Sequence, residues 1–106
     1  MIEITRIKNE QGEHVGFRCF GHAGFARHGK DVLCAGVSAL VLNTINSIEE
    51  FTEDKFSCAQ EEKSGLIEFV IVSEVSKEAS LFMDSLFLGL KNIEHDYGKR
   101  FITVKA

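Results

Sequence analysis

Apolar residues recur at every second position in two short stretches near the start of the chain. They are Ile2 and Ile4, followed by Val15, Phe17 and Cys19. A period of two places alternate side chains on one face of a β-strand. The polar stretch 9–13 between them contains a glycine, which is typical of a hairpin connection. The pattern therefore predicts two opening strands joined as a hairpin.

Helical spacing replaces this alternation from Cys34 to about Phe51. Apolar residues recur three or four positions apart at Val37, Val41, Ile45 and Ile48, with Leu40 beside them. This spacing gathers side chains on one face of a helix, so we expect that face to be buried.

A second helical pattern follows in the C-terminal part of the chain. Its apolar positions are Ala79, Met83, Leu86, Leu90, Ile93 and Tyr97. Ser73 or Ser76 can cap the start of this helix, because a serine hydroxyl accepts a hydrogen bond from a free amide there. Gly98 stands where a residue in the left-handed conformation commonly closes a helix.

The remaining apolar segments suit strands. Segments 56–60 and 66–72 flank a turn-like stretch at 61–65, and 101–104 offers a last short strand. The order strand, strand, helix, strand, strand, helix, strand predicts an α+β fold. We expect a two-layer α/β sandwich whose antiparallel or mixed sheet carries both helices packed on one face.

Composition and charge narrow the class of protein. A chain of 106 residues with 44% hydrophobic and 26% charged residues suits a single domain over 1–106. No run of about 18 apolar residues is present, so we expect a cytoplasmic protein that is not inserted in a membrane. A net charge of −4 with scattered basic residues gives little support to direct nucleic-acid binding.

The three cysteines differ in their surroundings. Their odd number and the lack of CxxC spacing argue against a disulfide framework and a structural zinc cluster, so we expect reduced thiols. Cys19 and Cys58 are in phase with apolar strand positions, which predicts that both lie in the core. Cys34 instead follows a segment rich in glycine and histidine.

That segment, residues 21–33, reads GHAGFARHGKDVL and is longer than the usual connection of about four to six residues. Long connections often carry function, and this one holds titratable groups at His22, His28 and Asp31. Its three glycines permit positive φ values and close approach of another chain, so we expect a flexible loop containing Gly21, Gly24 and Gly29.

Cys34 is the candidate nucleophile. A free thiol has a pKa of about 8.5, so a nucleophilic cysteine needs a base or a positive environment at neutral pH. Cys34 falls in the first turn of the predicted helix, where unpaired amides favour a thiolate. His22, at the end of a strand, could accept the thiol proton, and the Ala35 amide could stabilise an oxyanion.

Two further residues are candidates for supporting roles. Asp31 could cap the helix, or it could hold His22 in the correct tautomer. Ser38 lies one turn after Cys34 and could form a hydrogen bond near the thiol, although a helical serine commonly bonds to its own backbone.

Two other classes of function compete with an enzyme. His22, His28 and Cys34 could be three ligands of a zinc ion, but no second cysteine or acidic ligand stands at a recognised short spacing. We therefore predict no metal and no cofactor. Alternatively, the loop could grip a partner peptide in a non-catalytic binding module, with Cys34 incidental.

Residues 21–40, GHAGFARHGKDVLCAGVSAL, resemble the signature of the ribosomal-processing cysteine protease (Prp) family. The GHAG, GxD and CAGVSAL elements stand in the family's order and spacing. A weaker resemblance covers the whole chain, including LFLGLKNIEHDYGKRF near its C-terminal end.

The resemblance implies a cytoplasmic cysteine endopeptidase with a Cys34/His22 dyad, and with Asp31 and Ser38 near the site. It implies a substrate as well: the precursor of a bacterial large-subunit ribosomal protein, number twenty-seven. The family removes the N-terminal extension of that protein after a motif ending in paired phenylalanines, which supports ribosome assembly. It further implies a homodimer and a mobile loop before the first helix that substrate binding orders.

Overall fold

The computed structural model describes residues 1–22 and 30–105 of the chain, with the backbone alone at residues 30 and 31. Its elements, in chain order, are β1 (Ile2–Lys8), β2 (His14–Phe20), α1 (Lys30–Phe51), β3 (Phe56–Glu61), β4 (Leu66–Ile71), α2 (Lys77–Tyr97) and β5 (Ile102–Lys105). The predicted order of strands and helices is confirmed.

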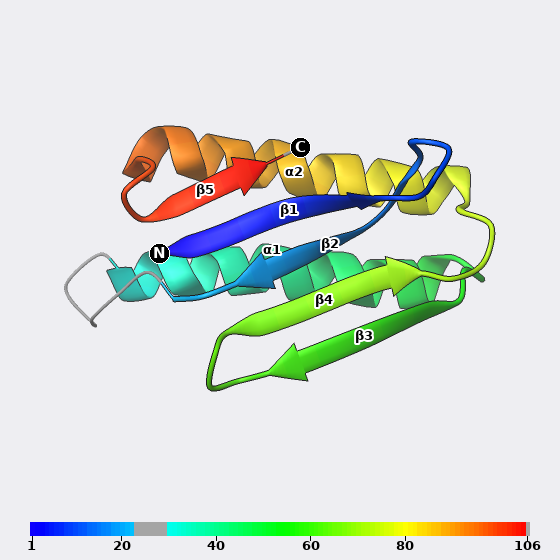
Figure 1. Cartoon of the computed structure of the whole chain (residues 1–106), viewed down its shortest axis with the longest axis horizontal. Helices are drawn as coiled ribbons and strands as arrows, with labels where there is room; N and C mark the ends of the chain where they lie inside the picture. The colour runs from blue at the N-terminus through cyan, green and yellow to red at the C-terminus, as the bar shows by residue number, and fades with distance from the viewer. Residues whose placement is uncertain (23–29, 106) are drawn as a thin grey trace.

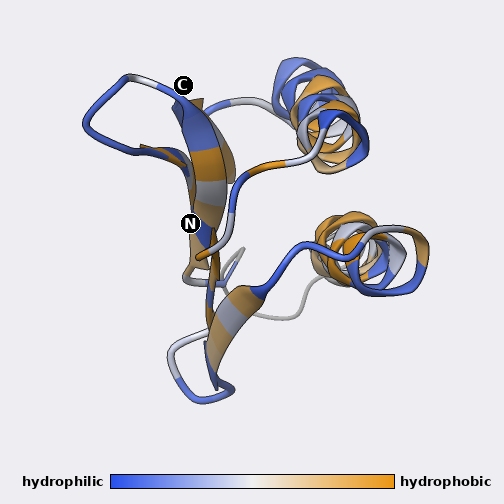
Figure 2. Ribbon diagram, turned by 90° about the vertical axis from the view of Figure 1, so that its right-hand side faces the viewer, coloured by the Kyte–Doolittle hydropathy of each residue, from blue (hydrophilic) through white to orange (hydrophobic). Residues whose placement is uncertain are grey.

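The five strands form one mixed sheet in the order β3-β4-β2-β1-β5. Strand β1 pairs antiparallel with β2 and parallel with β5, while β4 pairs antiparallel with both β2 and β3. Both helices lie on one face of this sheet, so the molecule has two layers (Figures 1 and 2). The predicted α+β two-layer sandwich is confirmed.

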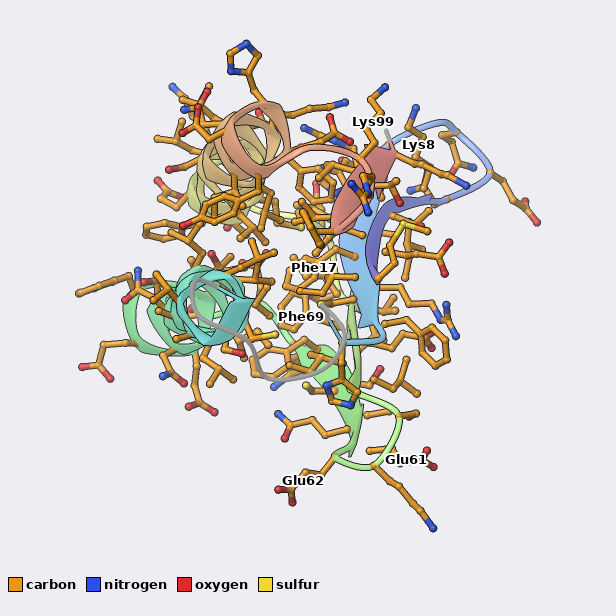
Figure 3. All side chains as sticks on the ribbon, turned by 90° about the vertical axis from the view of Figure 1, so that its left-hand side faces the viewer. Lys8, Phe17, Glu61, Glu62, Phe69 and Lys99 are labelled. Atoms are coloured by element: carbon orange, nitrogen blue, oxygen red, sulfur yellow. The ribbon has the colours of Figure 1, made fainter. Side chains whose placement is uncertain are left out.

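The core lies between the sheet and the helices. Phe17 of β2 and Phe69 of β4 are fully buried, and their rings stack with centroids 5.1 Å apart. Both side chains lie between the sheet and the helix layer (Figure 3). The helices contribute Val37, Val41 and Ile48 from α1 and Met83 and Leu90 from α2 to the same core.

Helix α1 begins at Lys30, earlier than the predicted start at Cys34. Leu33 is 2% exposed and belongs to the core, so apolar packing extends the helix toward its N-terminus. The connection after β2 is therefore limited to residues 21–29. Cys34 lies beyond the first turn of the helix, and the backbone of Asp31 is helical, while the cap predicted from its side chain lies outside the described residues.

Residues Val32–Phe51 of α1 are long and apolar enough to cross a membrane when judged by length and composition alone. The core helix of a soluble protein passes the same test, and α1 places Leu33, Val37, Val41, Ile45 and Ile48 in the core.

The start of α2 is capped as predicted, but the backbone conformation at its end differs from the prediction. Ser76 caps the start, since its hydroxyl oxygen accepts a hydrogen bond from the Ala79 amide at 3.0 Å. Gly98 closes the helix with a positive φ of 96°, and its amide donates to the Glu94 carbonyl at 2.8 Å. Its ψ of 157° lies outside the left-handed helical region, so the conformation predicted for this cap is wrong.

Candidate active site

Three segments meet at one end of the molecule: the end of β2, the start of α1 and the turn between β3 and β4 (Figure 1). A cavity of about 330 Å³ opens between them. Both Cys34 and His22 line this cavity, and so does Ser38. The fold thus brings the predicted nucleophile and the predicted base to one place.

The cavity is apolar inside and polar along one side. Ile2, Val37, Val41 and Ile67 contribute apolar side chains from the sheet and from α1. Gln60, Glu61 and Glu62 line it from the β3–β4 hairpin. Figure 3 shows Glu61 and Glu62 at the turn of this hairpin.

Cys34 is half-buried and packs against the core, while Ser38 is exposed on the next turn of α1. Ala35 follows Cys34 within the same helix. In a regular helix the amide of residue 35 pairs with the carbonyl of residue 31, so a role in an oxyanion hole requires this pairing to open. The roles of Ser38 and Ala35 stay predictions.

The other two cysteines, Cys19 and Cys58, differ from Cys34 in where they lie in the fold. Cys19 lies in the core as predicted, and burial, together with the nearby Cys34 thiol, raises its pKa to about 11. The core position predicted for Cys58 is wrong, because Cys58 is exposed on β3. That strand is at the edge of the sheet, and most of its residues are exposed.

His22 is exposed and lies two residues after the end of β2. Its Nε2 lies 3.2 Å from the carbonyl oxygen of Lys63, in the turn between β3 and β4. The nitrogen of Met1 donates to the His22 carbonyl. Gly21 has a φ of +93°, as its place in the glycine-rich segment predicted, and a Cβ there would overlap the Met1 carbonyl oxygen.

The β3–β4 turn is the part of the site that the sequence did not reveal. The Gly21 amide donates to the Ser64 carbonyl at 3.1 Å, beside the contact between His22 and Lys63. The residues at 61–65 signalled a turn, and Gly65 has a φ of +71° there. No local signal indicated that this turn packs against a residue so distant in the sequence.

Several predicted site residues lie outside the described residues. They are Gly24, His28 and Gly29, together with the side chain of Asp31. Within residues 1–22 and 30–105, no group of three His, Cys, Asp or Glu side chains could hold a metal ion. The proposed zinc ligand set is not tested, because it includes His28.

The amino-acid sequence is similar to those of known cysteine proteases. Residues 1–102 match the family model of the cysteine protease Prp. The ribosomal processing cysteine protease Prp of Bacillus subtilis is 30% identical over 101 residues, which cover 92% of this chain and 90% of that protein. The Staphylococcus aureus protein of the same name is 26% identical over 99 residues, 93% of each chain.

The fold of this chain is also similar to that of a solved structure. It is that of an essential ribosomal processing protease Prp from Staphylococcus aureus in complex with a covalently linked product peptide. The TM-score is 0.86 at 26% identity, and the match covers 99% of this chain and 98% of that chain. The similarity therefore extends over both layers of the fold.

Proposed function

Because the chain belongs to the Prp family of cysteine proteases, we propose that it cleaves a ribosomal protein precursor with Cys34 as nucleophile and His22 as base. One observation carries the proposal: the two residues line the same cavity although residues 23–33 separate them in the sequence. A nucleophile and a base that share a cleft are the minimum requirement for covalent acyl transfer.

The proposed reaction has two stages. The Cys34 thiolate attacks the scissile carbonyl carbon, and the C–N bond breaks as protonated His22 gives its proton to the leaving amine. A thioester then joins Cys34 to the N-terminal product. Water attacks this thioester with His22 as base, which releases a carboxylic acid and restores the thiol.

The proposed substrate is the precursor of the large-subunit ribosomal protein number twenty-seven, cut at an N-terminal extension with paired phenylalanines. The ribosomal-processing names of the relatives and the apolar interior of the cavity support this substrate. We place the reaction in the cytoplasm, where such a precursor is made, and assign it no cofactor.

We also propose that the protease is a homodimer. Leu81 and Leu88 of α2 are 67% and 66% exposed, and their spacing of seven places them on one face of the helix. Exposed apolar patches favour association with another protein surface. Sedimentation should give a dimer for the wild type and a monomer for Leu88→Glu, whereas a monomeric wild type would contradict this part of the proposal.

Cleavage of the extended ribosomal protein tests the proposed function directly. Purified protein should yield one truncated product by mass spectrometry. Cys34→Ala should lower the rate by on the order of 10⁴-fold or more, because removal of the nucleophile abolishes covalent catalysis. Cys58→Ser is the matched control, since Cys58 is exposed on the edge strand. A Cys34→Ala protein that still cleaves would refute the assignment.

A third variant, Cys34→Ser, separates a protease from a binding module. In a binding module, Cys34→Ser should keep both partner affinity and cellular function. In a protease it should keep affinity for the precursor and lose cleavage. Elemental analysis adds a check on the metal hypothesis, which predicts stoichiometric zinc.

A further inference from the structure

We propose that the β3–β4 turn positions His22 through the backbone carbonyl of Lys63. This inference rests on the proposed function, in which His22 is the base. It adds a third group to the dyad, and that group belongs to the main chain of a hairpin distant in sequence from both His22 and Cys34. Lys63 is thus a positioning residue that acts through its carbonyl oxygen.

This hydrogen bond determines which ring nitrogen of His22 carries the hydrogen in the neutral ring. The Nε2 atom of His22 lies 3.2 Å from the Lys63 carbonyl oxygen. A carbonyl oxygen can only accept a hydrogen bond, so Nε2 carries the hydrogen. In the neutral ring Nδ1 is then unprotonated, which makes Nδ1 the atom that takes the proton from Cys34.

The arrangement suits both protonation states of the base. When Nδ1 gains the thiol proton, the ring becomes a cation and its Nε2–H remains directed at the carbonyl. Hydrogen bonds from a charged donor are stronger than those from a neutral one. The Lys63 carbonyl therefore orients the neutral base and also stabilises the imidazolium that forms during attack, as a third group does in catalytic triads.

This geometry also bears on Asp31. With Nε2 bonded to Lys63 and Nδ1 used for the thiol proton, neither ring nitrogen is left for an Asp31 carboxylate. Of the two roles considered for Asp31, orientation of His22 is therefore disfavoured.

The turn is held against β2 by contacts between main chains. The Gly21 amide donates to the Ser64 carbonyl at 3.1 Å, and the Gly65 amide donates to the Glu62 carbonyl at 3.2 Å. The first bond ties the turn to the residue that follows β2, the second closes the turn on itself, and together they place the Lys63 carbonyl opposite the imidazole. Movement of the turn would therefore move the acceptor of the His22 ring.

Gly65 is the residue that allows this close approach. Its φ of +71° is one that other L-residues rarely adopt. A Cβ at this position would overlap the Gly21 carbonyl oxygen and would lie 3.0 Å from Cε1 of His22. A side chain at residue 65 must therefore push the turn away from His22.

The first experiment compares Gly65→Ala with Gly12→Ala in the cleavage assay. Gly12 also has a positive φ, of +79°, but a Cβ there meets nothing within 4 Å, so this variant has the backbone strain without the displacement. We expect Gly65→Ala to lower kcat by about 10- to 100-fold with KM nearly unchanged, as misplaced catalytic groups do. Gly12→Ala should keep the wild-type kcat. A folded Gly65→Ala protein with wild-type kcat would overturn the proposal.

A second measurement reads the tautomer without any cleavage and covers the case in which Gly65→Ala does not fold. The full-length Cys34→Ala protein, labelled with ¹⁵N-histidine, is studied by NMR at about pH 8.5, two units above the ordinary histidine pKa. Comparison with a protein that also carries His22→Gln identifies the signals of His22. We expect the neutral ring to carry its hydrogen on Nε2, and a ring with the hydrogen on Nδ1 would overturn the proposal.

The two readouts separate failure of the positioning role from failure of the proposed function. If the wild type cleaves the precursor but the hydrogen is on Nδ1, only the positioning role fails. If the hydrogen is on Nε2 but the wild type does not cleave the precursor, the geometry stands and the proposed function fails.

Discussion

Nη1 of Arg6 lies 2.6 Å from Nδ1 of His14, at the start of the second strand. The other ring nitrogen, Nε2, lies 2.8 Å from the Gly16 carbonyl oxygen and must donate to it. Nδ1 is therefore the acceptor for Arg6 in the neutral ring. Burial of the ring, followed by the positive charge of Arg6, lowers the pKa of His14 below its ordinary value of 6.5.

The lowered pKa of His14 predicts that the free energy of unfolding decreases in mild acid. Because the pKa of His14 is lower in the folded than in the unfolded protein, the unfolded state binds more protons between the two values. The contribution of His14 is fully present above pH 6.5 and is lost as the pH falls through the folded value. Chemical denaturation across this range should show the decline. His14→Gln should remove that part of it, whereas the same change at the exposed His95 should not.

Thiol labelling tests whether the three cysteines differ in reactivity as their surroundings predict. At about pH 6, iodoacetamide should modify Cys34 first if His22 activates it, because the thiolate is the reactive form. Cys58 is exposed but has no proposed base and should react more slowly than Cys34, and buried Cys19 should react last, since its pKa is about 11. Mass spectrometry of peptides measures the three rates. Equal rates at Cys34 and Cys58 in mild acid would argue against an activated nucleophile.

The order of elements could be predicted because each depends on a local pattern. Alternation at Val15 and Phe17 predicted β2, and helical spacing at Val37 and Val41 predicted α1. The sheet order could not be predicted, because it depends on pairing between strands such as β1 and β5 that are far apart in the chain. Cys58 was misplaced for the same reason, since only the sheet order shows that β3 is at an edge.

The candidate site was predictable where its residues lie within one motif. Cys34 and His22 belong to one short stretch rich in glycine and histidine. The chemistry and position of the thiol pointed to Cys34, whereas the choice of His22 depended more on the resemblance to the Prp family. The Lys63 carbonyl carries no sequence signal, because every residue has one. Its role arises from the packing of the β3–β4 turn against the end of β2.

Glu94 of α2 forms an unusual contact with the edge strand β5. Its Oε2 accepts a hydrogen bond from the Val104 amide at 2.8 Å, and Lys91 Nζ donates to the Val104 carbonyl at 3.0 Å. The hydrogen bond from Val104 is the main reason that the pKa of Glu94 lies below its ordinary value of 4.5. The two side chains thus occupy hydrogen-bonding groups that another strand could otherwise use.

We expect Glu94→Ala to lower the free energy of unfolding by about 1–2 kcal/mol, because the Val104 amide loses its acceptor. The contribution of Glu94 should be present above pH 4.5 and lost as the pH falls through its lower folded value, since the folded carboxylate binds protons less readily. Urea denaturation at neutral pH measures the difference. Glu49→Ala, an exposed change on α1, should stay within about 0.5 kcal/mol of the wild type. Equal effects of the two changes would contradict a specific role for Glu94.

Gly16 of β2 leaves no room for a side chain beside the main chain of β4. It pairs with Val70, and a Cβ at residue 16 would overlap the Phe69 carbonyl oxygen and lie 3.0 Å from the Val70 Cα atom. These are main-chain atoms in the middle of the sheet, so they cannot move aside without breaking the pairing. We therefore expect Gly16→Ala to destabilise the fold by about 2–3 kcal/mol, the cost of forcing extra volume into a packed interior.

Gly36 is the matched control for this substitution, because a Cβ there meets nothing within 4 Å. It lies inside α1, where alanine is preferred over glycine by about 1 kcal/mol. Gly36→Ala should therefore raise the midpoint of urea unfolding while Gly16→Ala lowers it, with the slope unchanged in both. The signs differ because a side chain at residue 16 meets main-chain atoms of β4, whereas at residue 36 it meets nothing and only the helix preference of alanine counts. A Gly16→Ala protein as stable as the wild type would mean that β2 and β4 lie farther apart than this structure places them.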